Sequence, residues 1–148
     1  MQSSESKRLV LYTDGASRGN PGPAALAVKI LDENGCVLQR FSKFLGKRTN
    51  NEAEYEALIA GLRLAGSFTG GQVQCFSDSE LVVKQLNGEY EVRNARLEDL
   101  WLKVRDLQKR FREVRFHYVP REDKNVQGVD RQANRILDRT SSQTPKSL

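Results

Sequence analysis

The sequence has no long hydrophobic run, and this absence excludes a first class of protein. Across 148 residues, no apolar stretch approaches the roughly 18 residues that a transmembrane helix needs. Residues 1–8 are polar and lack the apolar segment of a secretory signal. We therefore expect neither membrane insertion nor export, which leaves the cytoplasm as the predicted compartment.

Cysteine and histidine are also scarce, and their scarcity excludes several kinds of site. Cys36 and Cys75 are too few for a disulfide scaffold or a zinc site, and they fit a reducing compartment. His117 is the only histidine, so no Ser-His-Asp or Cys-His arrangement can be assembled. Because it alternates out of phase with Phe116 and Tyr118, we expect it on a strand surface and not as a base.

Charge is abundant, with 24 basic and 19 acidic residues and a net charge of +5. A mild excess of this kind fits a polyanionic partner without requiring one. The densest basic patch consists of Lys103, Arg105, Lys109, Arg110, Arg112 and Arg115. A solvated helix face explains this patch as well as nucleic-acid binding does, so charge alone leaves the partner open.

Apolar periodicity predicts alternating strands and helices along the chain. Strands are predicted at residues 9–13, 26–30, 36–45, 72–77 and 114–118. Helices are predicted from the residues after Asn50-Asn51 to residue 65, in a short segment that ends at residue 86, and at residues 95–111 and 129–140. The expected boundary signals are Asp14-Gly15 after the first strand, a type I′ turn at Asn34-Gly35, an N-cap at Ser77 or Asp78, and an N-cap at Asn94.

The resulting order, βββαβααβα, predicts an α/β fold with a five-stranded mixed sheet flanked by helices. Strands joined through helices should be parallel, and the first three should form an antiparallel meander. We predict one domain over residues 8–140, between a flexible N-terminus (residues 1–7) and a disordered polar tail (residues 141–148). The apolar helix stripe requires no partner, so a monomer is expected.

Four acidic residues are candidates for chemistry because of where the predicted elements place them. Asp14 and Asp78 follow strands that should be parallel, Glu54 lies at the start of a helix, and Asp130 opens the last predicted helix. Ligands of open α/β sheets bind at the carboxyl edge of the strands. Oxygen ligands without a nucleophile or paired base indicate a hard cation such as Mg²⁺ or Mn²⁺.

Each of these acids also has an ordinary structural explanation. An Asp-Gly pair after a strand is usually a turn, and Asp78 is equally suited to cap a helix. Asp130 would complement a helix dipole, and Glu54 would fit a solvated acidic face. The position of one acid alone does not decide between these interpretations.

Four sequence motifs change that balance when they are taken together. They read YTDGASRGNPGP at residues 12–23, TNNEAEYEAL at residues 49–58, SDSELV at residues 77–82, and VPREDKN at residues 119–125 followed by VDRQAN at residues 129–134. Their order and spacing resemble those of type 1 ribonuclease H across nearly the whole chain, and the predicted element order agrees with the ribonuclease H-like fold.

The resemblance implies a reaction and a set of residues that carry it. The metal-binding and catalytic acids of the family fall on Asp14, Glu54, Asp78 and Asp130. They would hold two Mg²⁺ ions, with Mn²⁺ as a substitute, and hydrolyse the RNA strand of an RNA/DNA hybrid to 5′-phosphate and 3′-hydroxyl ends. Asp14 would bridge both ions, and Glu54 would also reach the 2′-hydroxyl that distinguishes RNA from DNA.

The resemblance also assigns residues to substrate binding. The amides of Asn20, Asn50 and Asn51 match positions that contact the minor groove and sugars of the hybrid. Lys47 and Thr49 match contacts to phosphates of the DNA strand.

The sequence departs from the family pattern at three places. The loop after the fifth strand, residues 121–124, lacks the histidine of many bacterial members, and Arg121 or Glu122 is a candidate substitute. The segment from Asn125 to Asp130 is one residue longer than usual, with Gly128 inside it. The stretch at residues 88–92 is short and partly acidic, so the basic protrusion that grips the hybrid in some members is absent.

Two alternatives to a hybrid-specific nuclease stay open at this point. One is a metal-dependent nuclease of broader specificity, acting on double-stranded RNA or on DNA. The other is a hybrid-binding module without catalysis. Intact carboxylates weigh against the second alternative, because unneutralised acids oppose the binding of a phosphate backbone.

Overall fold

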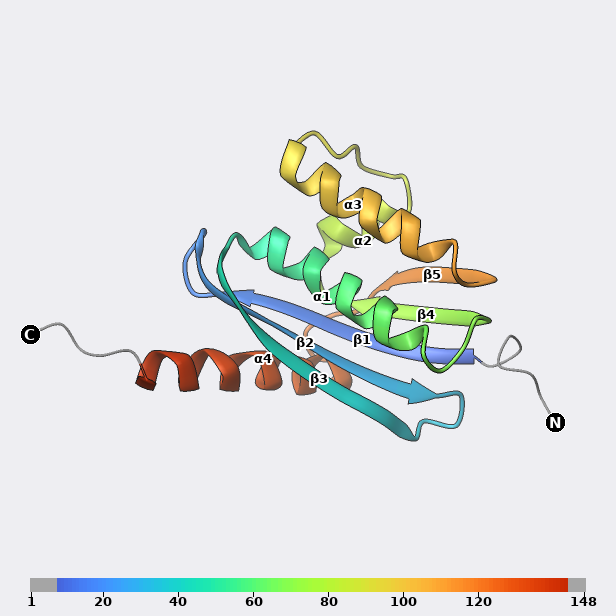
Figure 1. Cartoon of the computed structure of the whole chain (residues 1–148), viewed down its shortest axis with the longest axis horizontal. Helices are drawn as coiled ribbons and strands as arrows, with labels where there is room; N and C mark the ends of the chain where they lie inside the picture. The colour runs from blue at the N-terminus through green and yellow to red at the C-terminus, as the bar shows by residue number, and fades with distance from the viewer. Residues whose placement is uncertain (1–7, 144–148) are drawn as a thin grey trace, which may run out of the picture.

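The computed structural model describes residues 8–143, which form a five-stranded sheet in the order β3-β2-β1-β4-β5. The strands are β1 (Arg8–Ser17), β2 (Gly22–Asp32), β3 (Val37–Arg48), β4 (Gln72–Ser77) and β5 (Glu113–Tyr118). β2 is antiparallel to β1 and β3, whereas β4 is parallel to β1 and β5 (Figure 1). The predicted mixed sheet and element order are confirmed.

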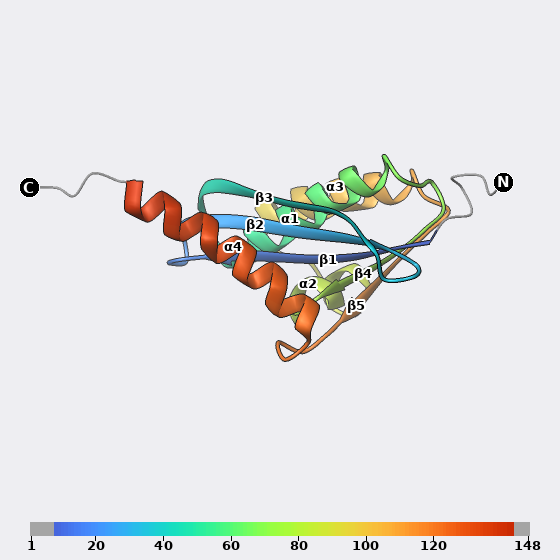
Figure 2. The ribbon, with the colours of Figure 1, turned by 90° about the horizontal axis from the view of Figure 1, so that it is seen from below.

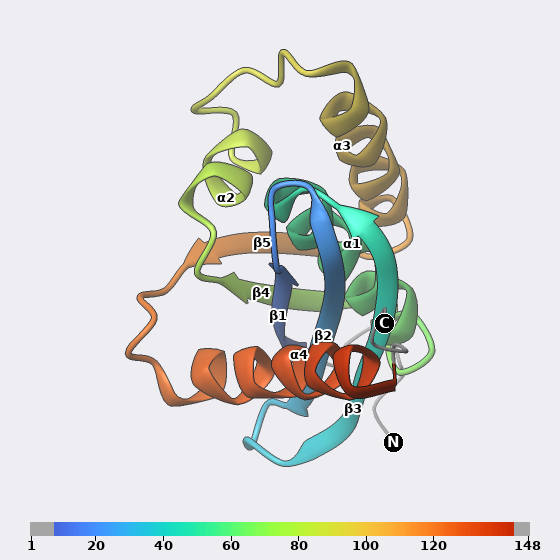
Figure 3. The same ribbon diagram turned by 90° about the vertical axis from the view of Figure 1, so that its left-hand side faces the viewer.

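Four helices cover the two faces of the sheet unequally. They are α1 (Asn50–Ala65), α2 (Glu80–Leu86), α3 (Ala95–Gln108) and α4 (Lys124–Gln143). α1, α2 and α3 lie on one side and α4 lies alone on the other, across β1, β2 and β3 (Figures 2 and 3). Within residues 8–143, no helix combines the length and the apolar character that crossing a bilayer requires.

Each face of the sheet has its own hydrophobic core. The larger core includes Leu11, Tyr55, Val73 and Val104, all buried between the sheet and the α1–α3 layer. The smaller core joins α4 to the sheet through Ala25, Ala27, Val129, Ala133 and Leu137. Because Ala25 and Ala27 on β2 have small side chains, α4 packs close to the sheet. The few buried residues of this smaller core form the contact that positions α4.

β1 is longer than predicted, which changes the setting of Asp14. The strand continues to Ser17 because it pairs with β2 along its length, with Asp14 opposite Ala27 and Ser17 opposite Ala24. The expectation that Asp14-Gly15 ends the strand is therefore wrong. Pairing with a neighbouring strand outweighs the local turn preference of Asp-Gly, and Asp14 lies inside the strand.

The turn between β2 and β3 also differs from the prediction. A type I′ turn needs positive φ at Asn34, but among residues 8–143 only glycines have positive φ, including Gly35 at 84°. The Asp32 carboxylate instead accepts hydrogen bonds from the N–H groups of Asn34 and Cys36, each at 2.9 Å. These hydrogen bonds close the loop between β2 and β3, which takes the place of the expected type I′ turn.

Side-chain caps decide where the helices begin. Asn94 caps α3 as predicted, but Ser79, not Ser77 or Asp78, caps α2. Thr49 caps α1 in a capping box with Glu52.

α4 begins earlier and ends later than predicted. The Asp123 carboxylate accepts hydrogen bonds from the N–H groups of Asn125 and Val126, so the helix starts at Lys124. Asp130 therefore lies inside α4 and does not open it. Residues 141–143, expected in the tail, are helical. The remaining tail and residues 1–7 lie outside the described residues, so the predicted domain boundaries stay predictions.

Gly15 marks the closest approach of β1 to α1. A β-carbon at this position would lie 2.1 Å from the carbonyl carbon of Ala53 and 2.3 Å from the nitrogen of Glu54. These neighbours are backbone atoms in a helix, so they cannot yield as a flexible side chain would. Only glycine permits this contact.

We predict that Gly15→Ala lowers the free energy of unfolding by at least about 3 kcal/mol, because the helix must move away from the sheet. Urea unfolding followed by circular dichroism measures this change. Gly128→Ala is the matched control: Gly128 lies in α4 with open space where a β-carbon would stand, so this substitution should stabilise by about 0.5–1 kcal/mol. A tolerated Gly15→Ala would contradict the close contact.

Candidate active site

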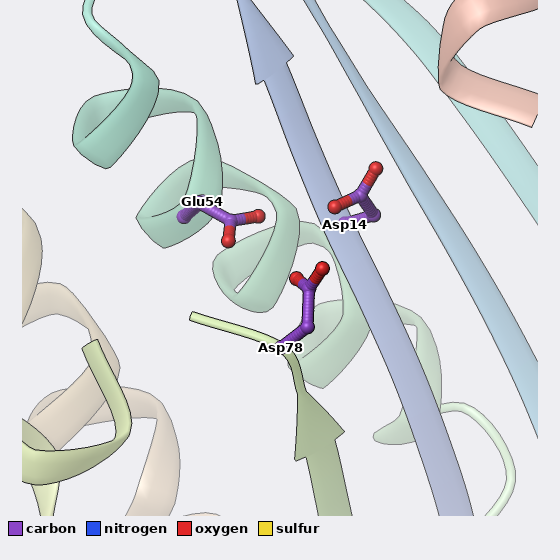
Figure 4. Close-up of side chains that lie close together, drawn as sticks. All are labelled: Asp14, Glu54 and Asp78. Carbon is purple, nitrogen blue, oxygen red and sulfur yellow. The ribbon is translucent and has the colours of Figure 1, made fainter. Parts of the chain in front are cut away.

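Three carboxylates from different elements meet at one point of the sheet edge. Asp14 comes from β1, Glu54 from α1 and Asp78 from the residue after β4, and one oxygen of each lies within 4.8 Å of the others (Figure 4). The pairing of β1 with β4 ends at Tyr12 and Phe76. Asp14 and Asp78 each lie two residues further along parallel neighbours, so their side chains meet beyond the end of β4.

Asp130 lies on the wall of the same hollow but is not one of the three grouped carboxylates. The hollow has a volume of about 280 Å³, and its lining includes Asp14, Glu54, Asp78 and Asp130. Asp130 is exposed on α4, and its charge acts on Asp14. The structure thus brings together all four acids selected from the sequence, three tightly and one at the rim.

Burial makes this group of acids electrostatically unfavourable without a cation. Asp14 and Glu54 are 4% and 6% exposed, and one oxygen of Asp14, Oδ2, is buried without a hydrogen-bond partner. Burial, followed by the charges of Glu54, Asp78 and Asp130, raises the pKa of Asp14 to about 10. The site therefore contains more negative charge than its protein surroundings can neutralise.

The other two acids are partly compensated by neighbouring groups. Burial raises the pKa of Glu54 to about 8, although the backbone N–H of Gly15 donates a hydrogen bond to Glu54 Oε1 and opposes this shift. Burial also raises the pKa of Asp78, while the nearby guanidinium of Arg121 lowers it. Asp14 is the least compensated of the three, which suits a position between cations.

Two further side chains contact the acids, and neither contact was predicted from the sequence. Arg121 follows β5, and its Nε lies 3.6 Å from Oδ2 of Asp78. The sequence pointed to this residue only as a candidate substitute for the missing histidine. Asn134, which was not selected, donates from Nδ2 to Oδ1 of Asp130 at 3.3 Å. The four-residue spacing of Asp130 and Asn134 on one helix is the sequence signal that would have found this second pair.

The residues predicted to bind substrate gather beside the hollow. Oδ1 of Asn20 accepts a hydrogen bond from the N–H of Asn50 at 3.0 Å, which joins the β1–β2 loop to the start of α1. Asn51 follows in α1, Thr49 is its N-cap, and Lys47 is exposed near the end of β3. Of these five residues, Asn50 also lines the hollow itself.

Comparison with known proteins identifies what this chain resembles. A family model described as reverse transcriptase-like matches residues 12–135. Ribonuclease HI of Halobacterium salinarum is 37% identical over 131 residues, which are 88% of this chain and 65% of that protein. Ribonuclease H of Chlorobium chlorochromatii is 31% identical, and the match covers 91% of this chain and 99% of the relative.

Solved structures give the same result. The RNase H1 structure from Halobacterium salinarum has a TM-score of 0.84 at 37% identity, covering 88% of this chain and 98% of that one. LC11-RNase H1 in complex with an RNA/DNA hybrid has a TM-score of 0.84 at 36% identity, covering 89% and 98%. Some relatives are longer: the match spans only 36% of a bifunctional protein of Mycobacterium tuberculosis that is 37% identical over 88% of this chain.

We predict that Asp14→Asn raises the free energy of unfolding of the metal-free protein by about 1–3 kcal/mol, because the buried Asp14 must stay protonated against its ordinary acidity and an amide has no such cost. The gain should grow as the pH rises. The pKa of Asp14 rises from 3.8 in the unfolded chain to about 10 in the folded protein, so the cost of burying this carboxyl is absent below about pH 4 and grows up to about pH 10. Urea unfolding in a chelator measures it, with the exposed Asp106→Asn as control. A destabilised Asp14→Asn would contradict the unfavourable burial of this carboxyl.

The raised pKa values of Asp14 and Glu54 should make metal binding depend on pH. Asp14, Glu54 and Asp78 could hold a metal ion, and a bound ion would displace the protons held by Asp14 and Glu54. Affinity for a divalent cation, measured with Mg²⁺ as the probe, should therefore rise by about tenfold or more between about pH 7 and about pH 9. Calorimetry in buffers of different ionisation enthalpy should detect the released protons, and Asp14→Asn should release fewer. Affinity that is independent of pH would refute the prediction.

Proposed function

This chain belongs to the type 1 ribonuclease H family, and from that premise we propose that it hydrolyses the RNA strand of RNA/DNA hybrids. One observation carries the proposal: the carboxylates of buried Asp14 and Glu54 and of partly buried Asp78 meet within 4.8 Å. A structural role does not account for them, because the acids repel one another and Asp14 has an unpartnered oxygen.

The donor set fits divalent metal ions. Carboxylate oxygens are the ligands that Mg²⁺ and Mn²⁺ prefer, and the unpartnered Oδ2 of Asp14 is a ligand atom in need of a partner. We propose that Asp14, Glu54, Asp78 and Asp130 hold two Mg²⁺ ions. When bound, such ions activate a water molecule and stabilise the leaving oxygen of an in-line displacement.

The protein residues around the acids have separate tasks in this proposal. Asp14, held within β1, would contribute its carboxylate to holding both ions. The N–H of Gly15 orients Glu54 by binding one carboxylate oxygen, which leaves the other oxygen for a metal or for the 2′-hydroxyl of the RNA. Asn134 orients Asp130 from the adjacent turn of α4. The expected products are a 5′-phosphate and a 3′-hydroxyl.

The surface beside the hollow suits a hybrid substrate. LC11-RNase H1, whose match covers 89% of this chain, has been solved with an RNA/DNA hybrid. Here Asn50 lines the hollow, Asn20 accepts a hydrogen bond from its N–H, and Asn51 is the next residue, so we propose that these short amides contact sugars and the minor groove. Lys47 and Thr49 precede them in the chain and would meet phosphates of the DNA strand.

Arg121 is the better candidate for the position of the missing loop histidine. Its guanidinium lies 3.6 Å from Asp78 and it lines the hollow, whereas Glu122 is exposed and adds a further negative charge. An arginine beside the acids can hold a phosphate or its product. We further propose that the protein acts as a monomer in the reducing cytoplasm, where its two cysteines stay as thiols.

The deciding experiment compares cleavage of one labelled sequence supplied as RNA/DNA hybrid, double-stranded RNA and double-stranded DNA, with Mg²⁺, with Mn²⁺ and with chelator. We expect cleavage of the RNA strand of the hybrid alone. Asp14→Asn should lower kcat by at least about a thousandfold, since several kcal/mol of transition-state stabilisation depend on the metals. Asp106→Asn, on the exposed side of α3, should retain full activity.

The other outcomes identify the alternatives. Comparable cleavage of all three duplexes would indicate a nuclease of broader specificity. Binding of hybrid without cleavage at any metal concentration would indicate a binding module. Full activity of Asp14→Asn with Mg²⁺ would refute the proposed site.

A further inference from the structure

A second hollow lies on the helical side of the sheet, away from the carboxylates. It has a volume of about 320 Å³ and opens between β3, α1 and α3, and Figure 1 shows α1 running between the other two elements. None of the residues that line it also lines the carboxylate hollow. It is therefore a separate feature, and a ligand bound there would not depend on the proposed nuclease activity.

The floor of this groove is apolar and partly accessible. Its apolar lining consists of Leu26, Phe41, Leu45, Ile59, Ala60, Leu64 and Leu100. Leu26 and Ile59 are buried core residues, whereas Phe41, Leu45, Ala60, Leu64 and Leu100 remain partly exposed. The surface thus offers a place where one or two large apolar side chains can be removed from water.

The rim of the groove carries positive charge that the protein does not neutralise. Lys43 on β3, Arg63 on α1 and Lys103 on α3 are exposed, and within residues 8–143 none of them has an ion-pair partner. The one acid in the lining, Glu56, is engaged by Arg48, with Nε 2.8 Å from Oε2. Three cations from three elements therefore surround an apolar floor.

The apolar floor and the positive rim together indicate which kind of ligand fits the groove. A nucleic-acid duplex presents phosphates to cations but has no apolar group to place in a hollow of this size. A second copy of this chain would bring a net charge of +5 to a positive rim. We propose that the groove binds a peptide segment of another protein, with one or two bulky apolar side chains on the floor and carboxylates opposite Lys43, Arg63 and Lys103.

The test uses a labelled peptide in which adjacent phenylalanine and leucine anchors are flanked by aspartates, with binding followed by fluorescence polarisation. Two further peptides separate the contributions: one replaces the anchors by serine, and the other replaces the aspartates by lysine. We expect only the first to bind, because charge and apolar contact are both needed.

Protein variants locate the binding site. Lys43→Glu combined with Arg63→Glu should weaken binding by at least about tenfold, since two attractive contacts become repulsive. Ala60→Leu should weaken it by filling the floor. Lys109→Glu, an exposed charge reversal beyond the end of α3 and outside the groove, is the matched control and should bind as the unaltered protein does. Circular dichroism confirms that each variant is folded.

Several results would overturn the proposal. These are no binding of the acidic apolar peptide, equal binding of the serine peptide, or equal weakening by the Lys109→Glu control. Competition by an RNA/DNA hybrid that is lost in the Lys43 and Arg63 variant would assign the groove to nucleic acid. Self-association in sedimentation that disappears in Ala60→Leu would assign it to a second copy.

Discussion

The contact between β1 and α1 at Gly15 is the constraint on which the site depends. The helix backbone lies so close to the strand that no side chain fits between them, and the N–H of Gly15 reaches the carboxylate of Glu54. Glu54 is thereby held beside Asp14, one residue before Gly15 in the strand. A larger residue at position 15 would move the whole helix, because Tyr55 and its neighbours are packed in the core.

The close contact matters because the acids resist being brought together. Asp14 and Glu54 are buried, their pKa values are raised, and the protein supplies few compensating charges. The apolar cores on both faces of the sheet must provide the free energy that keeps them in place. The fold therefore maintains a local instability that a divalent cation would relieve, which links metal binding to stability as well as to chemistry.

Much of the fold could be predicted from the sequence, because long apolar patterns report which face of each element is buried. The five-stranded mixed sheet and the order of strands and helices along the chain followed from these patterns. The errors fell where pairing with another strand, or a hydrogen bond from a nearby side chain, decides the local structure. β2 extends β1 past Asp14-Gly15, and Asp32 and Asp123 use their side chains to close a turn and to start a helix. The four acids were selected from the predicted elements, and the motif resemblance then favoured them as metal ligands. The contact of Asn134 with Asp130 lies within one motif and was overlooked, whereas the contact of Arg121 with Asp78 and the groove between β3, α1 and α3 depend on pairings that no single motif contains.

The unequal lengths of β1 and β4 have a consequence for the shape of a substrate. Where β4 ends and β1 continues, the sheet has a step, and the carboxylates stand on it with exposed Asp130 and Arg121 at its border. A tunnel has to be threaded from a chain end, but a polymer can settle sideways onto a ledge at any point along its length. If the protein cleaves a nucleic acid as proposed, this step in the sheet would favour cutting within a strand over trimming from its terminus.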